Sequence, residues 1–205
     1  MIKKILVANH KLFGKSVLVL LLVVLTFGCS ASYQAVKRGD ELVVMKNHYA
    51  AANEYLKALQ LDRGYEKAKM KLCQISRVAY EQKLAPAENF ERSVDFVSAL
   101  REYEDLSSFL DAINSYNCLN FTAINAKQKI AEMQSSASEK YYREAEGLFG
   151  SENYSDAIQK YKTALNYNNP YKDSTEKIAE SYYQIALKSE TQKRFRHATE
   201  NYVNA

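Results

Sequence analysis

The sequence has few of the residues that interrupt helices, and it has no tryptophan. It contains 6 glycines and 2 prolines in 205 residues, well below average usage. Because these two residues mark many turns and strand ends, their scarcity argues against a fold of many short strands. The strong helix formers alanine, lysine, glutamate, glutamine and leucine are abundant instead. The sequence therefore predicts an all-α fold.

Sequence motifs of common catalytic sites are also missing. The chain has no G-x-G-x-x-G, no P-loop, no H-E-x-x-H and no G-x-S-x-G motif. Its 3 histidines, His10, His48 and His197, have no cysteine or paired carboxylates at metal-ligand spacing. We therefore expect no enzymatic activity, no metal site and no cofactor.

The first 28 residues have the composition of an export signal. They carry Lys3, Lys4, Lys11 and Lys15 and no acidic residue, and they end in the apolar run SVLVLLLVVLTFG. This run is too short for a membrane-spanning helix, which needs roughly 20 apolar residues. A basic start, a short apolar run and a small final residue are typical of a secretory signal peptide. We predict that residues 1–28 are such a peptide.

The net positive charge of the chain comes from this leader. The whole chain has 28 basic and 24 acidic residues, and the four leader lysines account for the difference. The remaining residues carry 24 charges of each sign, so the overall charge gives no reason to expect nucleic acid as a partner.

The end of the leader is followed by a cysteine. The stretch TFGC, ending at Cys29, resembles the lipobox of bacterial lipoproteins, in which a cysteine follows a small residue after the apolar run. The resemblance implies that Cys29 receives a diacylglycerol, that the leader is removed, and that acyl chains anchor the protein through a short tether, residues 29–32. By the same resemblance, Ser30 in place of an aspartate favours the outer membrane, facing the periplasm. The alternative is an ordinary secreted protein with a chance cysteine near the cleavage site.

The other two cysteines, Cys73 and Cys118, fall in predicted helical segments far apart in the sequence. An exported protein permits a disulfide between them. Their spacing does not match a metal site, and we interpret them as small buried thiols.

An internal repeat links distant parts of the chain. Residues 48–72 match residues 154–178 after a shift of 106 positions. The shared pattern is a small residue, an alanine twelve positions later and a tyrosine four positions after that. Its three copies are Gly39, Ala51 and Tyr55; Ala145, Ala157 and Tyr161; and Ala186, Ala198 and Tyr202. In the middle, residues 84–135, FVSALREY (96–103) and LDAINSYN (110–117) imitate it in overlapping registers, which predicts one degenerate helix pair without fixed boundaries.

This spacing resembles the tetratricopeptide repeat (TPR), a pair of antiparallel helices. The resemblance implies a TPR-like solenoid of helical hairpins over residues 33–205, with a degenerate middle section. The alternative is a plain helical bundle. The expected helices cover residues 33–46, 48–61, 66–83, 87–114, 122–150, 154–167, 172–191 and 194–205.

TPR arrays bind extended peptides or partner helices along the first helices of their repeats. Carried over to this sequence, the resemblance implies a groove formed by Tyr33, Val36, Asp40, Val43, Glu139, Tyr142, Glu146, Phe149, Glu180, Tyr183, Leu187 and Glu190. The set has five acids and no lysine or arginine, so it predicts partner segments with basic and apolar side chains. The alternative is that the acids are ordinary exposed surface and the tyrosines pack between repeats.

Together these features predict a lipid-anchored, non-catalytic scaffold or adaptor of the bacterial envelope whose partners are other envelope proteins. One alternative is a lipoprotein that binds glycans or peptidoglycan fragments through its tyrosines. Another is a subunit resembling the TPR lipoprotein of the outer-membrane β-barrel assembly machinery.

Overall fold

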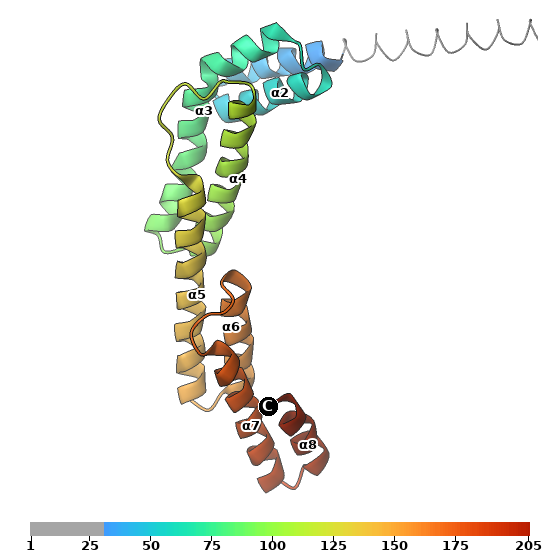
Figure 1. Cartoon of the computed structure of the whole chain (residues 1–205), viewed down its shortest axis with the longest axis vertical. Coiled ribbons are helices and arrows are strands. Elements are labelled where there is room, and N and C mark those ends of the chain that lie inside the picture. Colours follow the sequence, from blue (N-terminus) through green and yellow to red (C-terminus); the bar gives the residue numbers. More distant parts are fainter. Residues whose placement is uncertain (1–30) are drawn as a thin grey trace, which may run out of the picture. The chain divides into compact units, whose positions relative to one another are not determined.

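The computed structural model describes residues 31–205, and every regular element in this range is a helix. The leader and Cys29 lie outside the described residues. After a first helix over residues 31–44, the elements are α2 (His48–Leu61), α3 (Glu66–Arg92), α4 (Phe96–Ser115), α5 (Ala126–Gly150), α6 (Tyr154–Tyr167), α7 (Ser174–Thr191) and α8 (Phe195–Asn204) (Figure 1). The all-α prediction is confirmed for this part of the chain.

The expected helix boundary near Pro86 is wrong. Helix α3 continues through Pro86 and ends at Arg92, and the turn lies at residues 93–95 instead. Proline inside a helix removes one backbone hydrogen bond and costs about 3 kcal/mol. Buried residues on both sides of it, Tyr80 and Ala87, show that α3 packs along its length. We attribute the continuity of the helix to this packing.

Four pairs of consecutive helices are joined by the same short turn. At the first, the Asn47 amide donates to the Leu42 carbonyl and the Lys46 amide donates to the Val43 carbonyl, both at 2.9 Å. This pattern of two hydrogen bonds is a Schellman motif, in which one residue adopts a left-handed conformation. The same pattern closes the other three turns, and the left-handed residues are Lys46, Val94, Glu152 and Lys193. None of them is glycine, so the usual sequence signal for this turn is absent.

Each hairpin also repeats one packing pattern. An alanine four residues after the end of the turn is buried in all four second helices: Ala51, Ala99, Ala157 and Ala198. A small buried residue precedes it by twelve positions, in each first helix: Gly39, Ala87, Ala145 and Ala186. At Gly39 the approach leaves no room for a larger residue, because an added Cβ would lie 2.4 Å from the ring of Tyr55. The degenerate middle is thus the α3–α4 hairpin, with Ala87, Ala99 and Tyr103 in the repeat positions.

The middle hairpin decides between the two overlapping registers. FVSALREY begins α4 directly after the turn, so its alanine and tyrosine take the repeat positions. LDAINSYN, the other imitation, covers the C-terminal end of the same helix and the residues just after it. Helical spacing alone produced that second match.

A tyrosine ends the pattern in every hairpin, eight residues after the turn, and its hydroxyl donates to a carboxylate of the first helix. Tyr55 bonds Asp40 at 2.7 Å, Tyr103 bonds Glu91 at 2.5 Å, and Tyr202 bonds Glu190 at 3.0 Å. Tyr161 bonds Glu146 in the same way. Burial and the neighbouring carboxylate raise the pKa of Tyr55, Tyr103 and Tyr161 above its usual range. These bonds therefore keep the tyrosine hydroxyls protonated while they link the two helices.

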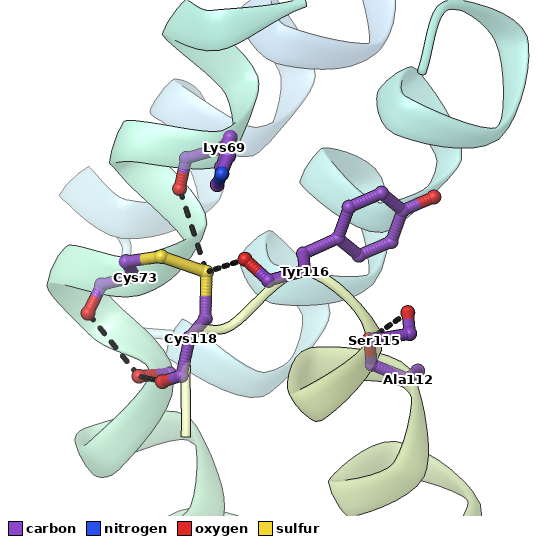
Figure 2. Close-up of a disulfide and its surroundings, with 7 residues drawn as sticks. Lys69, Cys73, Ala112, Ser115, Tyr116 and Cys118 are labelled. Carbon is purple, nitrogen blue, oxygen red and sulfur yellow. Dashed lines mark hydrogen bonds between the residues drawn. A yellow bond between two sulfur atoms is a disulfide. The ribbon is translucent and has the colours of Figure 1, made fainter. Parts of the chain in front are cut away.

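The interpretation of Cys73 and Cys118 as free thiols is wrong, because the two form a disulfide (Figure 2). Their Cα atoms are 4.5 Å apart, within the range of protein disulfides. Cys118 is not helical: it follows α4, where a further left-handed residue, Asn117, turns the chain toward α3. The Ser76 hydroxyl also donates to the buried Cys118 carbonyl at 2.9 Å. The bridge fastens the segment after α4 to α3.

The described chain divides into two compact units. The first contains residues 31–85 and 106–124, and the second contains residues 86–105 and 125–205. Helices α3 and α4 each contribute to both units. The disulfide belongs to the first unit, whereas the second holds the turn of the α3–α4 hairpin and the helices α5 to α8, packed as consecutive pairs.

Candidate interaction surface

The predicted groove residues of the first repeat differ widely in exposure. Tyr33 is 53% exposed, whereas Val36 is buried. Asp40 is half-buried and accepts from the Tyr55 hydroxyl and from Lys71, whose Nζ is 2.8 Å away. Val43 is half-buried near the turn. Only Tyr33 of this group therefore offers a large accessible side chain.

The four predicted residues of α5 form one face of that helix, and the following segments pack on it. Glu139, Tyr142, Glu146 and Phe149 are spaced by three or four positions and so share a face. The Tyr142 hydroxyl donates to Asp173 at 2.5 Å, and its ring contacts those of Tyr161 and Tyr171. The Lys177 ammonium lies 4.6 Å from the Phe149 ring centroid. This face is a packed layer between α5, α6 and the start of α7.

Glu139 is the best-satisfied acid of this layer. Its carboxylate accepts from Lys172 at 2.6 Å, from the Tyr171 hydroxyl at 2.5 Å and from Arg143 at 2.7 Å. These three donors, Lys172 foremost, lower the pKa of Glu139 to about 2. At neutral pH the carboxylate is therefore charged and already has cationic partners.

The predicted residues of α7 are more open. Glu180 is exposed and accepts from Gln184 at 2.6 Å, and Leu187 is half-buried. Tyr183 is 44% exposed and lies 5.8 Å from the ring of Tyr202, whose hydroxyl donates to Glu190. The α5 and α7 groups both lie in the second unit, and the first-repeat group lies in the other unit.

A cleft of about 680 Å³ opens beside the predicted face of α5. It is bounded by the turn before α4, by α5 and by the segment between α6 and α7. Its lining includes Val94, Phe96, Glu139, Lys140, Arg143 and Tyr171, so it shares only Glu139 with the predicted groove. A cleft of this size and mixed lining can hold one or two side chains of a bound peptide.

Two of the missed cleft residues depend on the position of a turn. Val94 and Phe96 reach the cleft only because α3 ends at Arg92, whereas the proline suggested an earlier end. One signal was available: Arg143 follows Glu139 by four residues, the spacing of a helical ion pair. That spacing indicates that Glu139 already has a basic partner.

Residues 31–205 contain neither a metal-binding cluster nor a membrane-spanning helix. No group of three or more histidine, cysteine, aspartate or glutamate residues there could hold a metal ion. In the same range, no helix combines the length and apolar character needed to cross a membrane.

Comparison with known proteins gives no family for the chain: no protein-family model matches it, and neither does any curated protein. The fold and the surface therefore define its class only as an all-helical protein of repeated hairpins in the described residues.

Proposed function

We propose that this protein is a lipid-anchored adaptor of the bacterial envelope, whose hairpins form a TPR-like solenoid that binds other envelope proteins. The observation that carries the proposal is the recurrence of one hairpin, with the same turn, buried alanine and tyrosine–carboxylate bond at four places. Repeated helix pairs form extended surfaces whose usual use is to bind proteins.

The disulfide supports the exported location. Disulfides persist in oxidising compartments such as the periplasm and are rare in the cytosol. The bond between Cys73 and Cys118 closes a sequence separation of 45 residues, which corresponds to about 4 kcal/mol of stabilisation in the chain-entropy description. A stabilising cross-link of this kind agrees with the leader and with the lipobox-like cysteine at position 29.

The packing of the tyrosines favours an adaptor over a glycan-binding protein. Glycan sites use aromatic rings with open faces. In the second unit, Tyr141 stacks on Tyr167 at 5.8 Å, and Tyr142 contacts both Tyr161 and Tyr171. Lysine ammonium groups lie over several of these rings, including Lys160 over Tyr141 and Lys172 over Tyr142. These rings are occupied by contacts within the chain.

Membrane fractionation with affinity capture tests the proposal. The wild-type protein and a Cys29→Ser variant would be expressed in the native cell, fractionated and captured, with bound proteins identified by mass spectrometry. We expect the wild type in the outer-membrane fraction with defined envelope partners. We expect the variant to lose the membrane and most of those partners, because the acyl anchor is absent.

A Cys73→Ser variant serves as the matched control, since it removes a cysteine without touching the anchor. It should remain in the membrane fraction, and after denaturation one free thiol, that of the buried Cys118, should react with an alkylating reagent. Equal fractionation of wild type and Cys29→Ser would refute the lipid anchor, and the absence of any specific partner would refute the adaptor role. Reduced thiols in the wild-type protein from intact cells would contradict an oxidising compartment.

A further inference from the structure

The turn between α3 and α4 contains an unfavourable residue. Val94 has a φ of 62°, a conformation that a β-branched side chain rarely adopts. The equivalent positions of the other hairpins carry the unbranched polar residues Lys46, Glu152 and Lys193. Val94 is 56% exposed, so burial does little to offset the cost of its backbone conformation. The turn itself therefore gives no reason for valine at this position.

The surroundings of Val94 give such a reason. Val94 lines the 680 Å³ cleft together with Phe96, two residues further on, and Tyr171 from the segment between α6 and α7. Tyr171 is held in place by its hydrogen bond to Glu139. Val94, Phe96 and Tyr171 are the apolar and aromatic residues of this lining, to which three separate segments contribute. Such a lining can bury one apolar side chain of a ligand.

The charges of the cleft favour an acidic ligand. Lys140 and Arg143 are cations of its lining, and Glu139 is the one acid among the lining residues. Glu139 is already bonded to Arg143, Lys172 and Tyr171, so a basic ligand would have to compete with these donors. Lys140 is exposed. Lys140 attracts the nearby Asp95 carboxylate electrostatically. That carboxylate accepts a hydrogen bond from the Ser98 amide at 3.2 Å and so caps α4.

We propose that this cleft binds an extended segment of a partner protein in which leucine or phenylalanine side chains alternate with aspartate or glutamate. An apolar side chain would contact Val94 and Phe96, and a neighbouring carboxylate would pair with Lys140. The inference rests on the proposed adaptor function and specifies the chemistry of the partner. It reverses the sequence-based expectation of a basic partner, because Glu139 is neutralised within the chain.

Val94→Asn and Lys140→Glu in the full-length protein test this site. The probes are two fluorescein-labelled nonapeptide libraries, one alternating Leu or Phe with Asp or Glu, the other alternating Leu or Phe with Lys or Arg. Fluorescence anisotropy should show tighter binding of the acidic library. Lys140→Glu should weaken that binding about tenfold or more, since it replaces an attraction by a repulsion.

Val94→Asn separates binding from folding. Asparagine tolerates the left-handed conformation, so the variant should melt about 2–4 °C higher while it binds the acidic library about fivefold to tenfold more weakly. Glu152→Asn is the matched control, because it introduces asparagine at the equivalent left-handed position of the α5–α6 turn, outside the cleft. It should keep wild-type binding.

Three results would overturn the inference: equal or tighter binding of the basic library, unchanged acidic binding in both Val94→Asn and Lys140→Glu, or an equal loss in Glu152→Asn. The adaptor function has its own outcome. If the envelope proteins captured with the wild type are retained by both cleft variants, the adaptor stands and the cleft assignment fails. If the wild type captures no envelope protein, the adaptor function itself fails.

Discussion

The α5–α6 and α7–α8 hairpins share one sequence pattern but bury it to different extents. Both have the Schellman turn and a pair of buried alanines, and both have a tyrosine that donates to a carboxylate of the first helix. Tyr161 is fully buried, whereas Tyr202 is 38% exposed. The difference arises because Ile178 of α7 and Tyr142 of α5 pack on the cluster around Tyr161, while the ring contact of Tyr202 is with Tyr183.

The comparison separates local from nonlocal contributions to the hairpin. The turn and the close approach of the helices depend on residues within the hairpin, so they recur wherever the pattern recurs. The burial of the tyrosine depends on the next helix, so it differs between copies. A substitution at the tyrosine should therefore distinguish the hairpins, and a substitution in the turn should not.

Removing the tyrosine ring should have the largest effect. Tyr161→Ala removes a buried ring and leaves a cavity, which should lower the free energy of unfolding by about 3–5 kcal/mol. Tyr202→Ala should cause a much smaller loss, because its ring is partly in water already. Urea denaturation followed by circular dichroism would measure both. Equal losses would show that the stabilisation by Tyr161 comes from contacts within its own hairpin rather than from contacts with α7.

Removing only the tyrosine hydroxyl should have a moderate effect. Tyr161→Phe keeps the ring but leaves the Glu146 carboxylate without this donor, at a cost of about 1–2 kcal/mol. Tyr202→Phe is the control, since its hydroxyl bonds Glu190 at an exposed site, and it should be close to wild type in the same urea titration. A Tyr161→Phe variant as stable as the wild type would indicate that the hydrogen bond to Glu146 adds no net stability.

Relieving the left-handed turn residue should have a similar small effect in both hairpins. Glu152→Gly and Lys193→Gly place glycine where φ is 60° and 61°, and each should gain about 1 kcal/mol because glycine adopts this conformation without strain. Differential scanning calorimetry of each variant would detect the gain. Unequal gains would mean that the two turns are not energetically equivalent.

An effect confined to acidic solution should appear as a dependence of stability on pH. The pKa of Glu139 in the folded protein, about 2, is below its ordinary value, so its bonds stabilise the fold above about pH 4.5 and are lost as pH falls toward 2. In the Glu139→Gln variant, the free energy of unfolding should therefore fall less steeply as the pH decreases from about 4.5 toward 2. Glu180→Gln, at an exposed site of α7, is the matched control and should show the same dependence on pH as the wild type.

Much of the helical pattern could be predicted from the sequence, whereas the cleft beside α5 could not. The limits of α2 and α6 agree with the expected ranges, because a strong period and clear turn residues surround them. The sequence predicts too early an end for α3, because the local penalty of Pro86 is visible in the sequence and the buried contacts beyond it are not. The turn at Val94 lacks glycine or asparagine and so gives no local signal.

The sequence by itself determined the helical class and the three clear repeat copies, because each depends on residues close together in the chain. Only the tertiary structure decided the fourth hairpin, the pairing of Cys73 with Cys118, and which acids already have partners. Those features depend on contacts between segments far apart in sequence. The acid Glu139 illustrates the difference: as one residue in a helix it suggests a basic ligand, but next to Lys172 and Tyr171 it is already neutralised.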